Sequence, residues 1–308
     1  TDALVLALMA MSVGAGDAVF VPDYTFFATA EAPAFLGATP VFVDIDPDTY
    51  NMSPASLEKC ISQVKAAGKL QPKAVIPVDL FGLPADYRAI SAIAKAHGLL
   101  VLEDAAQGFG GNMDGKRACS FGDIAATSFF PAKPLGCYGD GGALFTNDDT
   151  YAGKLRSLRV HGKGKDVYDN IGIGTNSRLD TLQAAILCVK LDAFASYELD
   201  AVQRIAERYT GLLNGTVKTP VIPEGYLSSW AQYCVVFDTN EKREQAKARM
   251  EQNGVPYRWY YLPLSMQKAF LTEADTPVAK DMSKRMLALP MSPYLTNEDM
   301  DHVCECIV

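Results

Sequence analysis

The sequence has little histidine, no excess of basic charge and no long apolar run. It contains 3 histidines in 308 residues, and no set of His and Cys residues has the spacing of a zinc site. Its formal net charge of −8 argues against a general nucleic-acid binder, because such proteins carry a basic field. No apolar stretch approaches the roughly 20 residues that span a bilayer. We therefore expect no metal site, no nucleic-acid partner and no membrane span.

The cysteines do not form the pattern of a disulfide framework. There are 7 of them, an odd number, scattered from Cys60 to Cys306. Only Cys304 and Cys306 lie close together, with one residue between them. Scattered cysteines of this kind are typical of reduced residues in the cytoplasm. The sequence therefore predicts a cytoplasmic protein.

Helical and apolar stretches alternate over the first two-thirds of the chain. Helical patterns lie at Ala3–Met11, Thr29–Leu36, Pro54–Ala67 and Tyr87–His97. Between and after them, short apolar runs predict strands at Ala18–Val21, Pro40–Ile45, Ala74–Val78, Leu99–Leu102, Ile124–Phe129 and Gly142–Thr146. These runs lack polar alternation, which indicates a sheet covered by helices on both faces. We therefore predict an α/β fold with a mainly parallel sheet.

The character of the sequence changes after this region. The segment His161–Thr175, rich in Gly, Lys and Asp, predicts a long loop, and a long helix is expected from Leu179 to beyond Arg204. Further on we predict a strand at Trp230–Phe237, a helix at Lys242–Gln252, a strand at Tyr257–Tyr261 and a helix from Asn297. The chain is thus divided into an α/β domain at 1–178, a connecting helix at 179–215 and a small α+β domain at 216–308. Because it opens at Thr1 directly into a helical pattern, we expect an N-terminal segment to be missing.

Polar residues follow the predicted strands where an open α/β sheet binds its ligands, beyond the carboxyl ends of the strands. Asp104 follows one strand, Ser128 ends another, and Lys133 comes five residues later, before the glycine-rich Gly136–Gly142. Taken alone, a lysine such as Lys133 is usually a surface lysine on a loop, and Asp104 is equally well explained as the N-cap of a helix at Ala105 and Ala106. Together they suggest pyridoxal phosphate, because a partly desolvated lysine can form a Schiff base and a carboxylate can keep the pyridine nitrogen protonated. The glycines lack the spacing of a nucleotide-binding loop.

Motifs along the whole chain support this interpretation. In order they are Thr1-Asp2-Ala3-Leu4, Gly16-Asp17 with Pro22, Thr25-Phe26 with Ala28-Thr29, Gly37 to Asp44, Glu103-Asp104-Ala105-Ala106-Gln107, Ser128 to Lys133, Gly139 to Ala143 and Asn176-Ser177-Arg178-Leu179. With this set the chain resembles the DegT-type nucleotide-sugar aminotransferases, which are pyridoxal-phosphate enzymes of fold type I. The resemblance implies a large cofactor domain, a smaller C-terminal domain and a homodimer with shared active sites.

The resemblance also implies a role for each matching residue. Lys133 holds the cofactor as a Schiff base and moves the proton, while Asp104 bonds the pyridine nitrogen. The other cofactor positions are Phe26 against the ring, Gln107 on its hydroxyl side, Ser128 with the Thr1 and Asp2 backbone at the phosphate, and Asn176 at the phosphate of the neighbouring subunit. Arg178 is the candidate for binding the substrate, through a carboxylate or phosphate.

The implied reaction moves an amino group, usually from glutamate, onto a nucleotide-linked keto sugar for polysaccharide biosynthesis such as lipopolysaccharide O-antigen. The segment from Phe130 to Gly142 looks most like members that aminate UDP-2-acetamido-3-keto-glucuronic acid. A 4-aminotransferase acting on a UDP- or dTDP-4-keto-6-deoxy sugar is the alternative, and a non-catalytic regulatory member is another. Related sugar dehydratases carry His in place of the lysine, which Lys133 argues against. Two departures, Ser265 and Ser292 where the family often has His, bear on sugar specificity.

Overall fold

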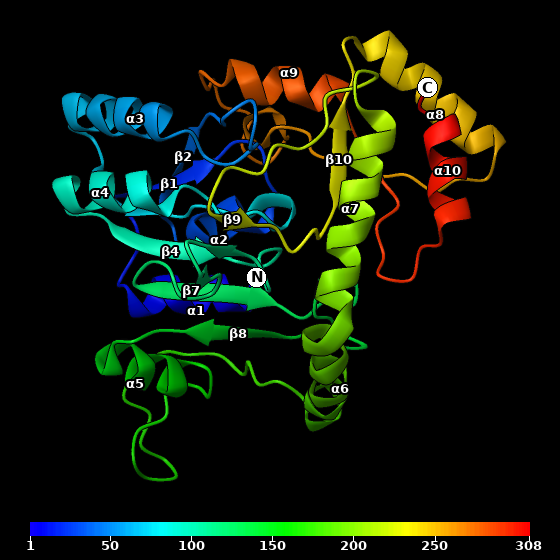
Figure 1. The fold of residues 1–308 in the computed structure, drawn as a ribbon. Coiled ribbons are helices and arrows are strands. Elements are labelled where there is room, and N and C mark those ends of the chain that lie inside the picture. Colours follow the sequence, from blue (N-terminus) through cyan, green and yellow to red (C-terminus); the bar gives the residue numbers. More distant parts are fainter.

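A six-stranded sheet forms the centre of the computed structural model, which describes all residues from 1 to 308 (Figure 1). The strands lie in the order β2-β1-β3-β4-β7-β8, with β7 and β8 antiparallel and the other neighbours parallel. Their bounds are β1 Asp17–Pro22, β2 Thr39–Val43, β3 Gln71–Val75, β4 Leu100–Asp104, β7 Ile124–Ser128 and β8 Gly142–Phe145. The prediction of a mainly parallel α/β sheet is confirmed.

Helices cover both faces of this sheet. One layer contains α1 Asp2–Ala10, α2 Ala28–Phe35 and α5 Asp149–Leu158, and the other contains α3 Pro54–Ala67 and α4 Tyr87–His97. In β1, Val19 and Val21 pack in the first layer and Phe20 in the second, because successive strand side chains point to opposite faces. All three are fully buried. Burial on both sides explains why the strand shows no polar alternation.

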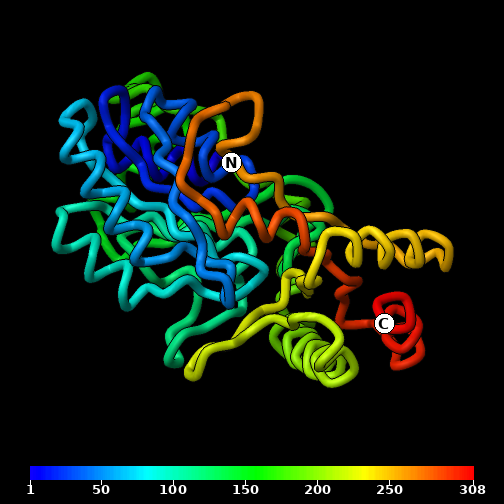
Figure 2. Tube along the Cα trace, turned by 90° about the horizontal axis from the view of Figure 1, so that it is seen from above, coloured from blue at the N-terminus to red at the C-terminus, as the bar shows by residue number.

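A long helical rod connects this part to the C-terminal part. It consists of α6 Thr181–Ala193, a π-helical turn at Phe194–Glu198 and α7 Leu199–Leu213, which follow one another directly. The long helix predicted from Leu179 is therefore confirmed. Beyond it lie β10 Tyr233–Val236, α8 Asn240–Gln252, α9 Pro277–Arg285, β11 Met286–Leu289 and α10 Asn297–Glu305. Figure 2 shows α8 and α10 at one side of the molecule and α3 and α4 at the other.

The C-terminal part has its own core. Tyr209 of α7, Tyr233 of β10 and Leu287 of β11 are fully buried together, with β10 and β11 pairing antiparallel. A second, three-stranded sheet joins β5 Asn112–Met113, β6 Lys116–Arg117 and β9 Tyr226–Leu227. The strand β9 thus pairs with the first part of the chain, although it falls in the range we assigned to the small domain. The division at residues 178 and 215 stays a prediction.

Several elements differ from the sequence prediction. The predicted strand Tyr257–Tyr261 is wrong, because this segment makes a single bridge, from Arg258 to Ala288, and its aromatic rings pack against Phe81 instead. The helices α5 and α9 and the strand β11 were not predicted. All seven cysteines are free. None of the helices combines the length and the apolar character needed to cross a bilayer.

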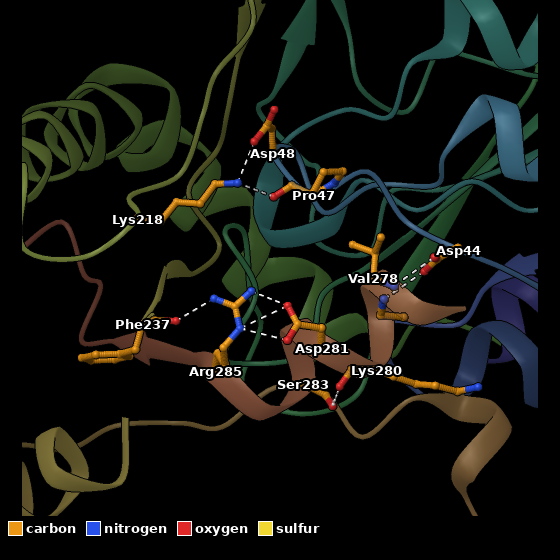
Figure 3. Close-up of polar contacts among 11 residues, drawn as sticks. Asp44, Pro47, Asp48, Lys218, Phe237, Val278, Lys280, Asp281, Ser283 and Arg285 are labelled. Carbon is orange, nitrogen blue, oxygen red and sulfur yellow. Dashed lines mark hydrogen bonds and ion pairs between the residues drawn. The ribbon is translucent and has the colours of Figure 1, made fainter. Parts of the chain in front are cut away.

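Buried carboxylates at the ends of β1 and β2 fasten the C-terminal part to the sheet. Asp44 accepts hydrogen bonds from the backbone N–H groups of Val278 (3.0 Å) and Ala279 (2.9 Å), in the first turn of α9 (Figure 3). Asp23, fully buried, accepts bonds from the hydroxyls of Ser265 (2.7 Å) and Thr276 (2.5 Å). The carboxylates satisfy donors that would otherwise be buried without partners. They hold the C-terminal part close to the carboxyl edge of the sheet.

Candidate active site at the carboxyl edge of the sheet

Asp104 ends β4 with a buried and well-fixed carboxylate. One oxygen accepts a hydrogen bond from the Thr29 hydroxyl at 2.9 Å, and the other accepts one from the Ala106 N–H at 3.2 Å. Burial raises the pKa of Asp104, and both hydrogen bonds and the positive charge of Lys133 oppose that rise. Each oxygen keeps a free lone pair, so the carboxylate can accept a further bond from a ligand. The turn that follows shows that Asp104 caps no helix at Ala105 and Ala106.

Lys133 lies in a tight turn after β7, near Asp104. Its backbone N–H donates to the Phe130 carbonyl at 2.9 Å, which fixes the turn, and its side chain is half-buried. Burial lowers the pKa of the Lys133 ammonium, and the negative charge of Asp104 partly offsets this effect. None of the nine salt bridges in the chain involves Lys133. A desolvated amine without an ion-pair partner is poised to act as a nucleophile.

A large cavity of about 1030 Å³ opens against β7, β8 and the start of α1, and its lining includes neither Asp104 nor Lys133. Its wall brings together the predicted phosphate-binding positions Thr1, Asp2 and Ser128, and also Asn176 and Arg178. Thr1 makes no side-chain cap, so the first N–H groups of α1 remain free for an anion. The Ser128 hydroxyl accepts a bond from the Phe130 N–H at 3.2 Å and has its own proton to donate.

Glycine is required where this wall comes closest to the sheet. A side chain at Gly142 would bring a Cβ within 2.6 Å of the Thr127 carbonyl oxygen, and one at Gly141 would lie 2.9 Å from Leu179. These glycines keep the backbone of β8 close to β7 next to Ser128. The glycine-rich segment therefore shapes the cavity.

Phe26 and Gln107 occupy different environments. Phe26 is 57% exposed, so a ring face is open to a ligand. Gln107 is buried, its carbonyl oxygen accepts from the Phe81 N–H at 2.8 Å, and its amide donates to the Tyr261 hydroxyl at 3.2 Å. Its contact with a cofactor hydroxyl stays a prediction, with one amide hydrogen left to make it.

The two positions at which the family often has His form hydrogen bonds with neither Asp104 nor Lys133. Ser265 is buried and both its N–H and its hydroxyl donate to Asp23, so it serves the contact between the two parts of the chain. The Ser292 hydroxyl accepts from the Tyr294 N–H. Neither serine lines the cavity. The effect of these two departures on sugar specificity stays a prediction.

The structure adds residues that the sequence had not singled out. Thr29 holds Asp104, and it lies one helical turn after Thr25, within a motif we had quoted. Arg156 and Arg159 line the cavity from α5 and the residue after it. Asp148 caps α5 by accepting from two N–H groups, and this Asp was a readable helix-start signal. No group of three or more His, Cys, Asp or Glu side chains is arranged to hold a metal ion.

The donor set fits pyridoxal phosphate. A buried carboxylate with free lone pairs suits a protonated pyridine nitrogen, and a desolvated lysine suits an aldehyde. The uncapped start of α1 beside Ser128 suits a phosphate. An exposed ring at Phe26 suits a stacked aromatic ligand. Each part of the cofactor thus finds a group of matching chemistry.

Comparisons with known proteins agree with this geometry. The DegT/DnrJ/EryC1/StrS aminotransferase family matches residues 1–308. The UDP-2-acetamido-2-deoxy-3-oxo-D-glucuronate aminotransferase of Pseudomonas aeruginosa is 46% identical over 310 residues, covering 100% of this chain and 83% of that protein. The UDP-N-acetyl-3-dehydro-alpha-D-glucosamine 3-aminotransferase of Acidithiobacillus ferrooxidans is 42% identical, with coverage of 100% and 81%.

Solved structures show the same fold. A DegT DnrJ EryC1 StrS aminotransferase from Brucella abortus has a TM-score of 0.96 and 50% identity, covering 99% of this chain and 82% of that one. NtdA from Bacillus subtilis, solved with bound cofactor PMP, has a TM-score of 0.88 and 29% identity, with coverage of 99% and 70%.

Proposed function

Since the chain belongs to the DegT/DnrJ/EryC1/StrS aminotransferase family, we propose that it aminates C3 of a UDP-linked keto sugar. It is a pyridoxal-phosphate-dependent enzyme of fold type I, as the sequence predicted. Our best assignment of the acceptor is UDP-2-acetamido-3-keto-glucuronic acid, with glutamate as the amino donor. The name of the relative from Pseudomonas aeruginosa, 46% identical over the whole chain, supports this choice.

The residues of the site divide the work of such a transamination. When bound, pyridoxal phosphate supplies an aldehyde that carries the amino group and a ring that withdraws electrons. Asp104 holds a proton at the ring nitrogen, and Ser128 with the start of α1 binds the phosphate. Lys133 is placed to take a proton from the donor carbon and return one to the sugar carbon. Orientation and proton transfer together provide the catalysis.

Arg178 is the residue we assign to the acceptor sugar. It lies in the cavity wall with Ser128, at the entrance to α6. A guanidinium can hold a sugar carboxylate through two parallel hydrogen bonds. Replacing Arg178 with alanine should raise the KM for the 3-keto-glucuronic acid substrate about 10- to 100-fold, as expected for the loss of a charged hydrogen bond. Steady-state kinetics with the neutral 3-keto-N-acetylglucosamine nucleotide, whose KM should change less than about threefold, is the control. Equal increases in KM for both sugars would show that Arg178 does not bind the sugar carboxylate.

The position of amination needs its own assay. The alternative, a 4-aminotransferase acting on a UDP- or dTDP-4-keto-6-deoxy sugar, belongs to the same family chemistry. Incubating the enzyme with glutamate and each keto sugar, and identifying the amino sugar by mass spectrometry and NMR, separates the two. Turnover of the 3-keto sugar supports the proposal, and turnover of the 4-keto sugar alone would overturn it. The presence of Lys133, Asp104 and Ser128 speaks against a non-catalytic regulatory protein.

A homodimer with shared sites is the assembly we propose. Apolar side chains with at least 70% exposure lie in two segments: Val167, Tyr168, Ile171 and Ile173 in the loop before α6, and Leu182 and Val189 in α6 itself. Exposed apolar area of this kind favours a covering partner. Within one chain Asn176 lines the same cavity as Ser128, so a hybrid test is needed to assign its subunit.

Two inactive variants can test the sharing of sites. If Asn176 serves the neighbouring subunit, mixing the Lys133→Ala and Asn176→Ala proteins creates one intact site in each hybrid dimer. After subunit exchange the mixture should regain about a quarter of the wild-type activity, as two-fold symmetry dictates. No regain, with hybrid dimers confirmed by native mass spectrometry, would place Asn176 in the site of its own chain.

The pathway and location complete the proposal. An amino sugar linked to UDP is suited to the assembly of surface polysaccharide, including lipopolysaccharide O-antigen. The seven free cysteines favour the reducing cytoplasm as the place of the reaction.

A further inference from the structure

Two buried carboxyl groups lie directly behind Asp104, and neither belongs to the cofactor site. Asp79 follows β3, and Glu103 precedes Asp104 in β4. Both are fully buried, and their side chains are close enough to hydrogen-bond if one of them carries a proton. Asp79 is also tied to Asp104 itself, because its backbone N–H donates to the Asp104 carbonyl at 3.0 Å.

The donors around this pair leave room for one more proton. One oxygen of Asp79 accepts from the Tyr87 hydroxyl (2.8 Å) and the Ala85 N–H (3.2 Å), but Oδ2 has no donor unless Glu103 provides it. The two oxygens of Glu103 accept from the N–H groups of Cys119 (2.5 Å) and Phe121 (2.7 Å). A carboxylic acid oxygen can accept and donate at once. A proton on Glu103 therefore satisfies every polar atom of the pair.

No positive charge compensates the pair. The titratable groups that face it are Tyr87 from α4, Cys119 from the segment before β7 and Asp104 from β4. None of them is a cation. Two ionised carboxylates in contact would place two anions behind Asp104, in surroundings that penalise buried charge. Burial and the neighbouring Asp79 accordingly raise the pKa of Glu103 to about 10.

We propose that Asp79 and Glu103 share one proton and act as positioning residues for Asp104. The shared proton bonds the end of β3 to β4, so the Asp104 backbone is fixed on the side away from the cofactor. It also leaves one negative charge, rather than two, behind a carboxylate that has to stay ionised to hold the pyridine nitrogen. This role rests on the use of pyridoxal phosphate by the chain.

Gly108 shows how closely the surrounding chain is fitted to the pair. An added Cβ at Gly108 would lie 2.3 Å from Oδ2 of Asp79 and 2.5 Å from its Cβ. Gly108 directly follows the segment Asp104 to Gln107, and its backbone N–H donates to the Ala105 carbonyl. The same segment that carries Asp104 therefore folds over Asp79, and displacement of Asp79 would move it.

The shared proton is tested by the Asp79→Asn variant. The asparagine side chain keeps the bonds to Tyr87 and Ala85 and donates its amide to an ionised Glu103, so no proton is needed. Wild-type protein takes up a proton on folding, because the pKa of Glu103 is raised above its unfolded value of about 4.3. The stability that this group contributes is therefore lost as the pH rises towards the folded pKa. The unfolding constant of the wild-type protein accordingly rises about tenfold per pH unit.

We expect the unfolding constant of Asp79→Asn, relative to wild type, to fall about tenfold per pH unit between about pH 7.5 and 9. Urea unfolding of the cofactor-loaded proteins measures it. Asp192→Asn, which removes an exposed carboxylate, is the matched control and should show no such slope. Glu103→Gln should be less stable than Asp79→Asn, since one of the Cys119 and Phe121 N–H groups then faces an NH₂ group. If the ratio of the Asp79→Asn unfolding constant to the wild-type constant does not change with pH, the two carboxyl groups do not share a proton.

The positioning role is tested by cofactor affinity. Asp79→Ala leaves Glu103 without its acceptor and should raise the Kd for pyridoxal phosphate, followed by absorbance titration, about tenfold or more. Asp79→Asn should restore the Kd to within about threefold of wild type and preserve the visible spectrum of the bound cofactor. An unchanged Kd in a folded Asp79→Ala protein would reduce the pair to a purely structural role. If Asp79→Ala does not fold, a Kd for Asp79→Asn raised about tenfold would equally refute the proposal.

Discussion

Replacing Lys133 with alanine should lower kcat/KM for transamination about 10⁴-fold or more, while the protein still folds and binds pyridoxal phosphate. Lys133 makes no salt bridge, and its half-buried amine contributes chemistry rather than a contact that holds the fold together. In the proposed function, this amine bonds the cofactor covalently and moves the proton. Both functions are lost together, so the effect exceeds that of removing a general base alone.

Mass spectrometry separates this loss from misfolding. After borohydride reduction, wild-type protein should carry the mass of the cofactor on the peptide that contains Lys133, and the Lys133→Ala protein should carry none. Lys133→Arg is the matched control, because arginine keeps a positive charge beside Asp104 but stays protonated and cannot form the bond. A covalent cofactor in either variant would show that another lysine holds it.

The central parts of the site could be predicted because they are local in the sequence. Asp104 and Lys133 follow predicted strands and Ser128 lies at the end of one, and the carboxyl ends of parallel strands converge on one edge of the sheet. Their order in the chain therefore predicts that they lie at one edge of the sheet, whereas their roles at the cofactor rest on the family resemblance and stay predictions. The structure adds the groups that tune them, such as the hydroxyl of Thr29 in helix α2, which donates to Asp104 at the end of β4.

The elements that were missed depend on contacts between distant segments. The start of α9 has no side-chain cap of its own, because Asp44, more than 230 residues earlier, accepts from its first N–H groups. A search for local capping residues does not find such a helix. The aromatic run at Tyr257–Tyr261 has the composition of a strand, but only Arg258 bridges to Ala288 of β11, and the rings of Tyr260 and Tyr261 pack against Phe81. Composition alone does not reveal which aromatic or apolar segment becomes a strand beside β11.

Replacing Asp104 with asparagine should lower kcat about 10²- to 10³-fold, the range found when one preorganised charged or polar group is lost from an active site. The amide has nearly the same shape, its oxygen can accept from the Ala106 N–H and its NH₂ group can donate to the Thr29 hydroxyl, so the fold should persist. It carries no charge, so it does not keep the ring nitrogen protonated, and the electron-withdrawing power of the ring falls. Single-turnover kinetics of the conversion of glutamate measures this loss directly.

The pH dependence of kcat/KM tests whether activity requires the ionised form of Asp104. Burial raises the pKa of Asp104, and the Thr29 hydrogen bond opposes the rise. Activity needs the ionised carboxylate, so wild-type kcat/KM should fall as the pH falls through this pKa. Thr29→Val removes the hydrogen bond, raises the pKa further and should move this acid limb to higher pH, whereas Asp104→Asn should lose the limb while retaining its low rate. An acid limb that stays in place in Thr29→Val would assign it to another group, and the charge on Asp104 would no longer account for the profile.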